Sequence, residues 1–156
     1  MALRNILTKE EPLLYKKCRP VTAFNARLHQ LLDDMADTMY EADGVGLAAP
    51  QVGVLKRAVV IDVGEGLIEL VNPEILWTEG EAISTEGCLS VPGKHAEVTR
   101  PMKVTVRAFD AEMKEFTLTA EGLEARCILH ENDHLNGILY ADRAEGPLED
   151  NAAEEA

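Results

Sequence analysis

The amino-acid sequence predicts an α+β fold with short, mainly antiparallel strands in mixed sheets, because its helical and strand patterns come in blocks. An amphipathic helical pattern comes first, over residues 24–41, and short strand patterns follow between residues 57 and 119. A second helical pattern begins near residue 121. A doubly wound parallel fold would instead alternate strands with helices. We therefore expect sheets packed around the C-terminal helix, with an N-terminal amphipathic helix beside them.

The composition excludes two classes of partner. The chain has 156 residues, which is the length of one domain. Its formal net charge of −13 argues against direct nucleic-acid binding, which relies on Lys and Arg side chains that displace counterions from phosphates. Every apolar run is shorter than the roughly 18 residues that indicate a membrane-spanning helix. We expect neither direct nucleic-acid binding nor a membrane partner.

The first helix and the strands are predicted from hydrophobic spacing. In the first helical pattern, apolar residues recur three or four positions apart with acidic residues between them. This pattern ends at the turn signal Asp43-Gly44. Further along, β-branched or alternating segments predict four strands, of which the last two form a hairpin. These strands cover residues 57–63, 67–71, 98–109 and 115–119.

The second helix is predicted because apolar residues and two histidines share one helical face from residue 121 onward. Gly137 fits the C-cap of this helix. Residues 144–156 then hold five acidic residues and no Lys or Arg, which predicts a flexible tail. We therefore expect a single domain over residues 1–143, followed by an acidic tail over residues 144–156.

The motif His130-Glu131-Asn132-Asp133-His134 is the strongest functional signal in the sequence. Because four residues advance an α-helix by about 400°, the two imidazoles lie one turn apart on one face and can share a metal ion. Glu131, rotated by about 100°, can reach a water on that metal without being a ligand. A catalytic site of this kind needs a third protein ligand and an open position.

The motif alone does not identify the third metal ligand. Such ligands often follow the helix, where the available acids are Asp142, Glu145 and Glu149. An upstream alternative is Cys88, which precedes a Pro-Gly turn where a thiolate can face a cleft. An isolated cysteine is more often a small buried hydrophobe. The odd number of cysteines, three in all, predicts reduced thiols.

A glycine-rich segment over residues 44–51 reads Gly-Val-Gly-Leu-Ala-Ala-Pro-Gln. It partly matches a dinucleotide-binding fingerprint, but that fingerprint follows a strand and opens a helix. Here the segment follows a predicted helix, which argues against nucleotide binding. The pattern favours a loop whose glycines let the backbone approach a ligand closely, and which ends in the amide side chain of Gln51.

Three segments, in this order and at these separations, resemble the peptide deformylase family: Gly-Val-Gly-Leu-Ala-Ala-Pro-Gln, Glu-Gly-Cys-Leu-Ser and His-Glu-Asn-Asp-His. The resemblance extends from residue 12 to residue 143. It implies a catalytic domain that removes the formyl group from N-terminal formyl-methionine of newly made polypeptides and releases formate. It also implies that Cys88, His130 and His134 hold one divalent cation with water or hydroxide in the fourth position, with Glu131 as general base and then general acid.

The resemblance implies roles for other residues as well. The Gln51 side chain and the Leu89 N–H would stabilise the oxyanion. The backbone at Gly44 and Gly46 would pair with the substrate as an added strand. Residues that would line a pocket for the methionine side chain, or would equally be core, are Val45, Leu123 and Cys127.

An ion pair is also expected near the cysteine. Glu86 and Arg100 match positions where the resemblance implies a pair that braces the loop of Cys88. The alternative is a solvated surface pair, worth at most about 1 kcal/mol.

The resemblance further implies the cofactor and the partners. It points to Fe²⁺, whereas a Cys-His-His ligand set suits Zn²⁺ equally. The expected partners are N-formyl-methionyl peptides, with transient proximity to the ribosome. The short acidic C-terminus lacks the basic helix with which some relatives dock there. Formyl-methionine initiation makes a bacterial cytoplasm the expected location, and residues 1–11 show no secretory leader.

Three alternatives stay open from the sequence. A peptidase that cuts internal peptide bonds would share the His-Glu-x-x-His motif, but would leave the Glu-Gly-Cys-Leu-Ser segment unexplained. A relative acting on another N-acyl compound would keep the same residues. An inactive relative would keep the fold and bind peptides only.

Overall fold

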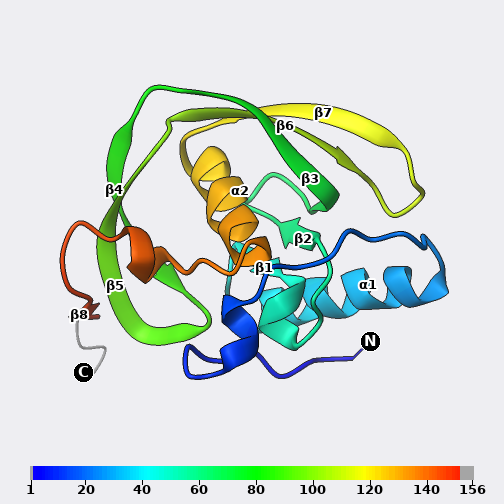
Figure 1. Ribbon diagram of the computed structural model, residues 1–156, viewed down its shortest axis with the longest axis horizontal. Coiled ribbons are helices and arrows are strands. Elements are labelled where there is room, and N and C mark those ends of the chain that lie inside the picture. The colour runs from blue at the N-terminus through cyan, green and yellow to red at the C-terminus, as the bar shows by residue number, and fades with distance from the viewer. Residues whose placement is uncertain (1, 152–156) are drawn as a thin grey trace.

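Two α-helices and two sheets organise the chain in this computed structural model, which describes residues 2–151 (Figure 1). The helices are α1, Ala26–Glu41, and α2, Gly122–Leu135, and short 3-10 helices cover Pro12–Tyr15, Ala49–Val52 and Tyr140–Arg143. The larger sheet has the strand order β1-β2-β3-β6-β7, with all neighbours antiparallel. Its strands are β1 Gly46–Ala48, β2 Ala58–Ile61, β3 Ile68–Glu79, β6 Lys103–Phe109 and β7 Glu115–Glu121.

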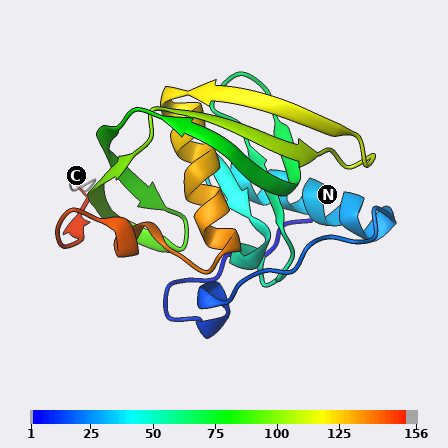
Figure 2. The ribbon, with the colours of Figure 1, turned by 45° about the horizontal axis from the view of Figure 1, so that its top comes forward.

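The smaller sheet is antiparallel and has the order β4-β5-β8. Its strands are β4 Ala82–Cys88, β5 Val91–Arg100 and β8 Glu149–Asp150. Helix α2 lies between this sheet and the larger one, as Figures 1 and 2 both show. The predicted arrangement of mixed antiparallel sheets around a C-terminal helix is therefore present. Within residues 2–151, no helix combines the length and apolarity needed to cross a membrane.

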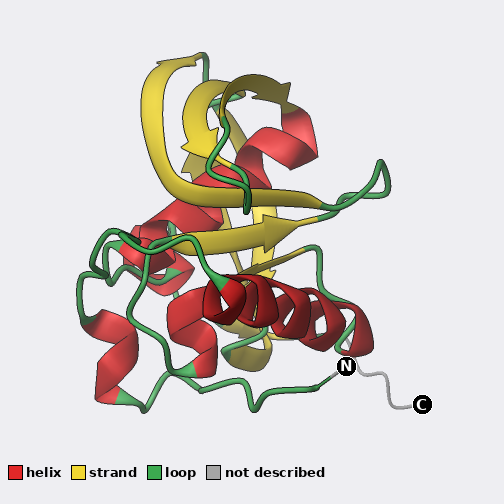
Figure 3. Cartoon of the chain, turned by 90° about the vertical axis from the view of Figure 1, so that its right-hand side faces the viewer, coloured by secondary structure: helices red, strands yellow, loops and turns green. Residues whose placement is uncertain are grey.

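The β1–β2 part of the larger sheet is buried on both faces, and β2 shows how the sequence achieves this. Val59 and Ile61 join the cluster that contains the apolar residues of α2, while Ala58 and Val60 join the cluster that contains those of α1. Successive side chains of a strand point to opposite faces. A continuous apolar strand therefore packs against one helix on each side, and α1 lies below the strands in the view of Figure 3.

Helix α1 is present where the sequence predicts it, with its start at residue 26 instead of 24. The side chain of Asn25 accepts a hydrogen bond from the Leu28 N–H and so caps the first turn. The buried apolar residues are those of the predicted stripe, namely Leu28, Leu31, Leu32, Met35 and Met39. Asp43 then takes a φ of 58°, which turns the chain toward β1.

The hairpin β4–β5 differs from the prediction. The sequence suggests a turn at Val91-Pro92-Gly93 and a strand from residue 98, whereas β5 begins at Val91 and the turn lies at Leu89-Ser90. Residues 46–48, expected as loop, form β1. In both places the pairing with a neighbouring strand outweighs weak local preference, because strand propensity depends on what the strand packs against.

Part of the predicted tail also pairs with β5. Ala144 bridges Val98, the Glu145 N–H donates to the Glu97 carbonyl at 2.9 Å, and β8 continues the pairing. The tail was predicted from composition, and composition carries no signal for such backbone pairing. Residues 152–156 of the predicted tail lie outside the described residues.

Candidate active site

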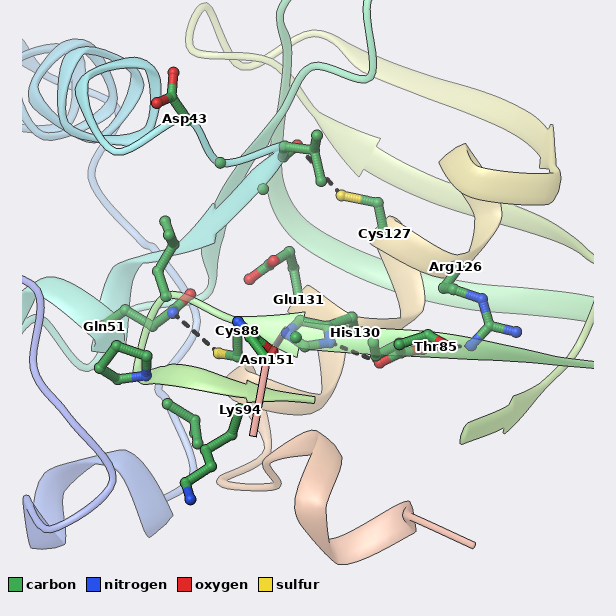
Figure 4. A pocket seen from close by; sticks show the side chains of 18 of the residues that line it. Asp43, Gln51, Thr85, Cys88, Lys94, Arg126, Cys127, His130, Glu131 and Asn151 are labelled. Atoms are coloured by element: carbon green, nitrogen blue, oxygen red, sulfur yellow. Dashed lines mark hydrogen bonds and ion pairs between the residues drawn. The ribbon is translucent and has the colours of Figure 1, made fainter. Parts of the chain in front are cut away.

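Three side chains that can ligate a metal converge between the two sheets. Cys88 ends β4, and His130 and His134 lie one turn apart on α2. One ligand atom from each residue lies within 4.8 Å of the others, and Cys88 Sγ is 3.3 Å from His134 Nε2. Figure 4 shows Cys88 and His130 side by side in the cleft.

The donor set fits a tetrahedral metal ion. Typical Zn–S and Zn–N bond lengths give a sulfur-to-nitrogen edge of about 3.5 Å, close to the separation of Cys88 Sγ and His134 Nε2. The Nδ1 atom of His130 lies 2.9 Å from Glu86 Oε1, which orients the ring. A histidine ligand commonly donates its second N–H to a carboxylate in this way. Three protein donors leave a fourth position for a reactant.

Glu131 lies beside the three ligand residues and is buried. Its Oε1 atom makes no hydrogen bond to any residue that the structure describes. Burial raises the pKa of this carboxyl to about 7, although His130 and Arg100 pull the pKa down. A carboxyl with a pKa near neutrality can both take up and release a proton under physiological conditions.

Hydrogen bonds hold the amide of Gln51 beside Cys88. Its Oε1 accepts the Ala48 N–H at 2.9 Å, so the amide orientation is set by the backbone of β1. Its Nε2 donates to Ser90 Oγ at 3.0 Å and lies 3.6 Å from Cys88 Sγ. A buried N–H donor is therefore held next to the converging ligand atoms.

The predicted Glu86–Arg100 pair is buried, not a solvated surface pair. Arg100 Nε and Nη2 contact the two oxygens of Glu86 at 2.5 and 3.0 Å. Arg126 Nη1 adds a second cation at 2.5 Å from Glu86 Oε2. Burial alone would raise the pKa of Glu86, but the hydrogen bonds from His130 and Arg100 lower it to about 2. The carboxylate stays charged and holds His130.

Sequence reasoning missed several members of this network. Arg126 also donates to the carbonyls of Ala82 and Val98, so it ties α2 to β4 and β5. Asp133, read only as a variable position of the motif, accepts hydrogen bonds from Arg100 and Arg143. The sequence signal that could have identified Arg126 and Asp133 is a charged residue on the buried side of α2, because an unpaired buried charge is costly.

A cleft of about 460 Å³ opens beside these groups, a volume typical of ligand pockets. Val45 and Leu123 are 43% and 57% exposed, so they are not core residues, whereas Cys127 is both buried and part of the lining. Of the predicted site residues, His134 and Arg100 lie behind the lining. The others, which line the cleft, are Gly44, Val45, Gly46, Gln51, Glu86, Cys88, Leu89, Leu123, Cys127, His130 and Glu131.

Two glycines are required by close contacts. A Cβ on Gly46 would lie 2.6 Å from Glu131 Oε2 and 2.7 Å from Cys127 Sγ. A Cβ on Gly44 would lie 2.7 Å from Leu89 Cδ1. The glycines were predicted to admit a ligand; the structure shows that they also admit neighbouring side chains of the site.

Comparison with known proteins shows which family the chain resembles. A sequence profile of the family described as polypeptide deformylase matches residues 3–149. Peptide deformylases of Caldicellulosiruptor bescii and Agathobacter rectalis are 64% and 56% identical, covering 92% and 96% of this chain and 86% and 95% of their own.

Two solved structures of peptide deformylases share the fold of this chain. The peptide deformylase of Legionella pneumophila superposes with a TM-score of 0.90 at 49% identity, over 92% of this chain and 87% of its own. The peptide deformylase of Thermotoga maritima superposes with a TM-score of 0.92 at 39% identity, over 94% of this chain and 100% of its own. The chain therefore belongs to the polypeptide deformylase family.

Proposed function

We propose that the cleft hydrolyses the formyl group of N-terminal formyl-methionine on newly made polypeptides. The observation that carries the proposal is the convergence of Cys88, His130 and His134 beside the buried carboxyl of Glu131. Water oxygen adds to the formyl carbon, the carbon–nitrogen bond breaks, and formate and a free amino terminus result. Residues 1–143 act as one catalytic domain, with the segment up to residue 151 paired along β5.

Cys88, His130 and His134 would hold one divalent cation. Such a cation supplies Lewis-acid chemistry and lowers the pKa of a coordinated water to about 7. We propose Fe²⁺ as the native metal; a thiolate with two imidazoles also accepts Zn²⁺. Metal content of protein purified without oxygen, compared with protein purified in air, distinguishes the two, because an iron–thiolate site is oxidised in air.

Glu131 is the proposed general base and general acid of the reaction. Its carboxylate takes a proton from the attacking water and delivers it to the departing amine. Gln51 Nε2 and the Leu89 N–H donate to the oxygen that becomes negatively charged. The position of Gln51 Nε2, 3.6 Å from Cys88 Sγ, supports this role for the amide.

The edges of the two sheets offer a place for the peptide backbone. β1 is one of the two edge strands of the larger sheet and β4 is one of the two edge strands of the smaller sheet, and residues of both line the cleft. A peptide between them would add a strand to either edge. The exposed apolar side chains of Val45 and Leu123, with Cys127 behind them, would receive the methionine.

Because the proposed substrates are newly made formyl-methionyl polypeptides, the reaction takes place near the ribosome in a bacterial cytoplasm. The bacterial relatives support this setting. We propose transient proximity without direct nucleic-acid binding, because the net charge of −13 opposes contact with phosphates. Co-sedimentation with ribosomes that depends on salt would contradict this view.

Formate release tests the proposal. Protein purified without oxygen and supplied with Fe²⁺ is given formyl-Met-Ala-Ser, its acetylated form and an unformylated peptide. Formate from the formyl peptide alone is expected, and the Cys88→Ala variant should release none. Cleavage inside the unformylated peptide would favour an endopeptidase. Turnover of the acetyl peptide alone would favour another N-acyl substrate.

A further inference from the structure

A short N-terminal arm, residues 4–9, contacts the site without lining the cleft. Figure 1 shows this arm in dark blue, passing below α1 toward the smaller sheet. One end is anchored on α1: the Arg4 N–H donates to Thr38 Oγ1 at 2.9 Å, and the Arg4 guanidinium pairs with Asp34 Oδ2 at 2.9 Å. Because the Asp34 side chain is buried, water competes little for this ion pair, and the arm is fixed to a helix.

The other end of the arm bonds to two buried residues that lie next to Cys88. The Leu7 N–H donates to the Gln51 carbonyl at 2.7 Å, and the Lys9 N–H donates to the Ser90 carbonyl at 2.9 Å. Buried carbonyls need a hydrogen-bond partner inside the protein. The arm supplies that partner for both residues, and so joins them through its own backbone.

Gln51 and Ser90 belong to different parts of the fold. Gln51 lies in the 3-10 helix that follows β1, and Ser90 lies in the turn between β4 and β5, directly after Leu89. These two segments carry the proposed oxyanion donors, Gln51 Nε2 and the Leu89 N–H. The Gln51 amide also donates to Ser90 Oγ at 3.0 Å, so a side-chain bond and the backbone of the arm connect the same two segments.

We propose that the arm is a positioning element for the oxyanion donors, because it holds the Gln51 segment and the Leu89-Ser90 turn at a fixed separation. This inference rests on the proposed deformylation. Oxyanion donors act by being in place before the charge develops, and small displacements of reacting groups slow a reaction strongly. Loosening the arm displaces both donors without removing either, so kcat should fall by about tenfold, less than for the loss of one donor. Metal content and KM should stay close to those of the parent, because β4 and α2 carry the ligand residues.

Two substitutions of Lys9 test the bond to the turn. Lys9→Pro removes the N–H that donates to Ser90, whereas Lys9→Ala keeps that N–H and removes only an exposed side chain. Lys9→Pro should lower kcat on formyl-Met-Ala-Ser by about tenfold, and Lys9→Ala should match the parent. Formate release from the metal-loaded full chain gives kcat and KM, elemental analysis gives metal content, and circular dichroism verifies folding.

Two substitutions of Arg4 test the anchor without changing a backbone group. Arg4→Ala removes the ion pair with Asp34 and should lower kcat by about threefold at unchanged KM. Arg4→Lys keeps a cation opposite Asp34 and should restore most of the loss. This pair keeps every N–H of the arm, so it tests the inference even where Lys9→Pro does not fold.

Combination with Gln51→Ala separates positioning of the donors from a general loss of rigidity. If the arm acts through Gln51, Lys9→Pro should lower kcat by a smaller factor in Gln51→Ala than in the parent. Equal factors in the two backgrounds, unchanged kcat in folded Lys9→Pro or Arg4→Ala, or loss of metal from either variant overturns the inference while the parent still releases formate. Absence of formate from the parent chain would overturn the proposed function itself.

Discussion

The back and the mouth of the cleft are built in opposite ways. At the back, Glu86 and Arg100 are only 5% and 4% exposed, and each makes hydrogen bonds to two or more partners. At the mouth, Val45 and Leu123 are largely exposed, and the ion pairs of β8 face solvent. A buried charge network allows one arrangement, whereas an exposed wall tolerates several. The back should therefore control rate and stability, and the mouth should control selectivity.

The largest effect is expected at Glu131. Glu131→Ala should keep the metal and lower kcat by about 10⁴, the upper end for loss of a general base. Formate release and metal content are measured on the same sample. Glu124→Ala, on the same helix, should keep both. Metal loss in Glu131→Ala would contradict the base assignment.

Two arginines compare a buried with an exposed ion pair. Arg100→Gln removes the buried cation that Glu86 and Asp133 share, and Arg126 and Arg143 compensate only part of that loss. The free energy of unfolding should therefore fall by about 3 kcal/mol, the lower end for a broken buried ion pair. Arg107→Gln breaks the exposed contact with Glu74 and should cost less than about 1 kcal/mol. Urea denaturation measures both. Equal losses would contradict the view that the buried charge network at the back of the cleft controls stability.

Gln51 tests the oxyanion donor. Gln51→Ala removes the N–H beside Cys88 and should lower kcat by about 10²–10³ with little change in KM. Gln30→Ala, a substitution of the same kind on α1, should leave kcat unchanged. Steady-state kinetics on formyl-Met-Ala-Ser separate the two constants. A rise in KM alone would make Gln51 a binding residue.

A pair of glycines gives the smallest effect. The Cβ of Gly46→Ala would clash with Glu131 and Cys127, so the variant should lose about 1–3 kcal/mol of stability and part of its activity. Gly146→Ala adds a Cβ with no atom within 4 Å and should change neither. Thermal unfolding and formate release provide the readouts. Equal behaviour of the two variants would show that β1 adapts to the added methyl group.

The sequence predicted the parts of the site that depend on local spacing. His130 and His134 share a helix face by periodicity alone, and α1 follows from its apolar stripe. Cys88 was selected only through the family resemblance, because a single cysteine carries no spacing. The contact of Arg126 with Glu86 and the pairing of β8 with β5 were not predictable, since both join residues distant in the sequence through tertiary contacts.

The ligand set is the centre of this account, and metal stoichiometry tests it most directly. Elemental analysis is made on Cys88→Ala, His130→Ala and His134→Ala, with His29→Ala on the surface of α1 as control and circular dichroism to verify folding. The account predicts one metal ion per chain in the parent and in His29→Ala, and loss of that ion from each folded ligand variant. A folded ligand variant that keeps one tightly bound ion per chain would contradict the assignment of that residue.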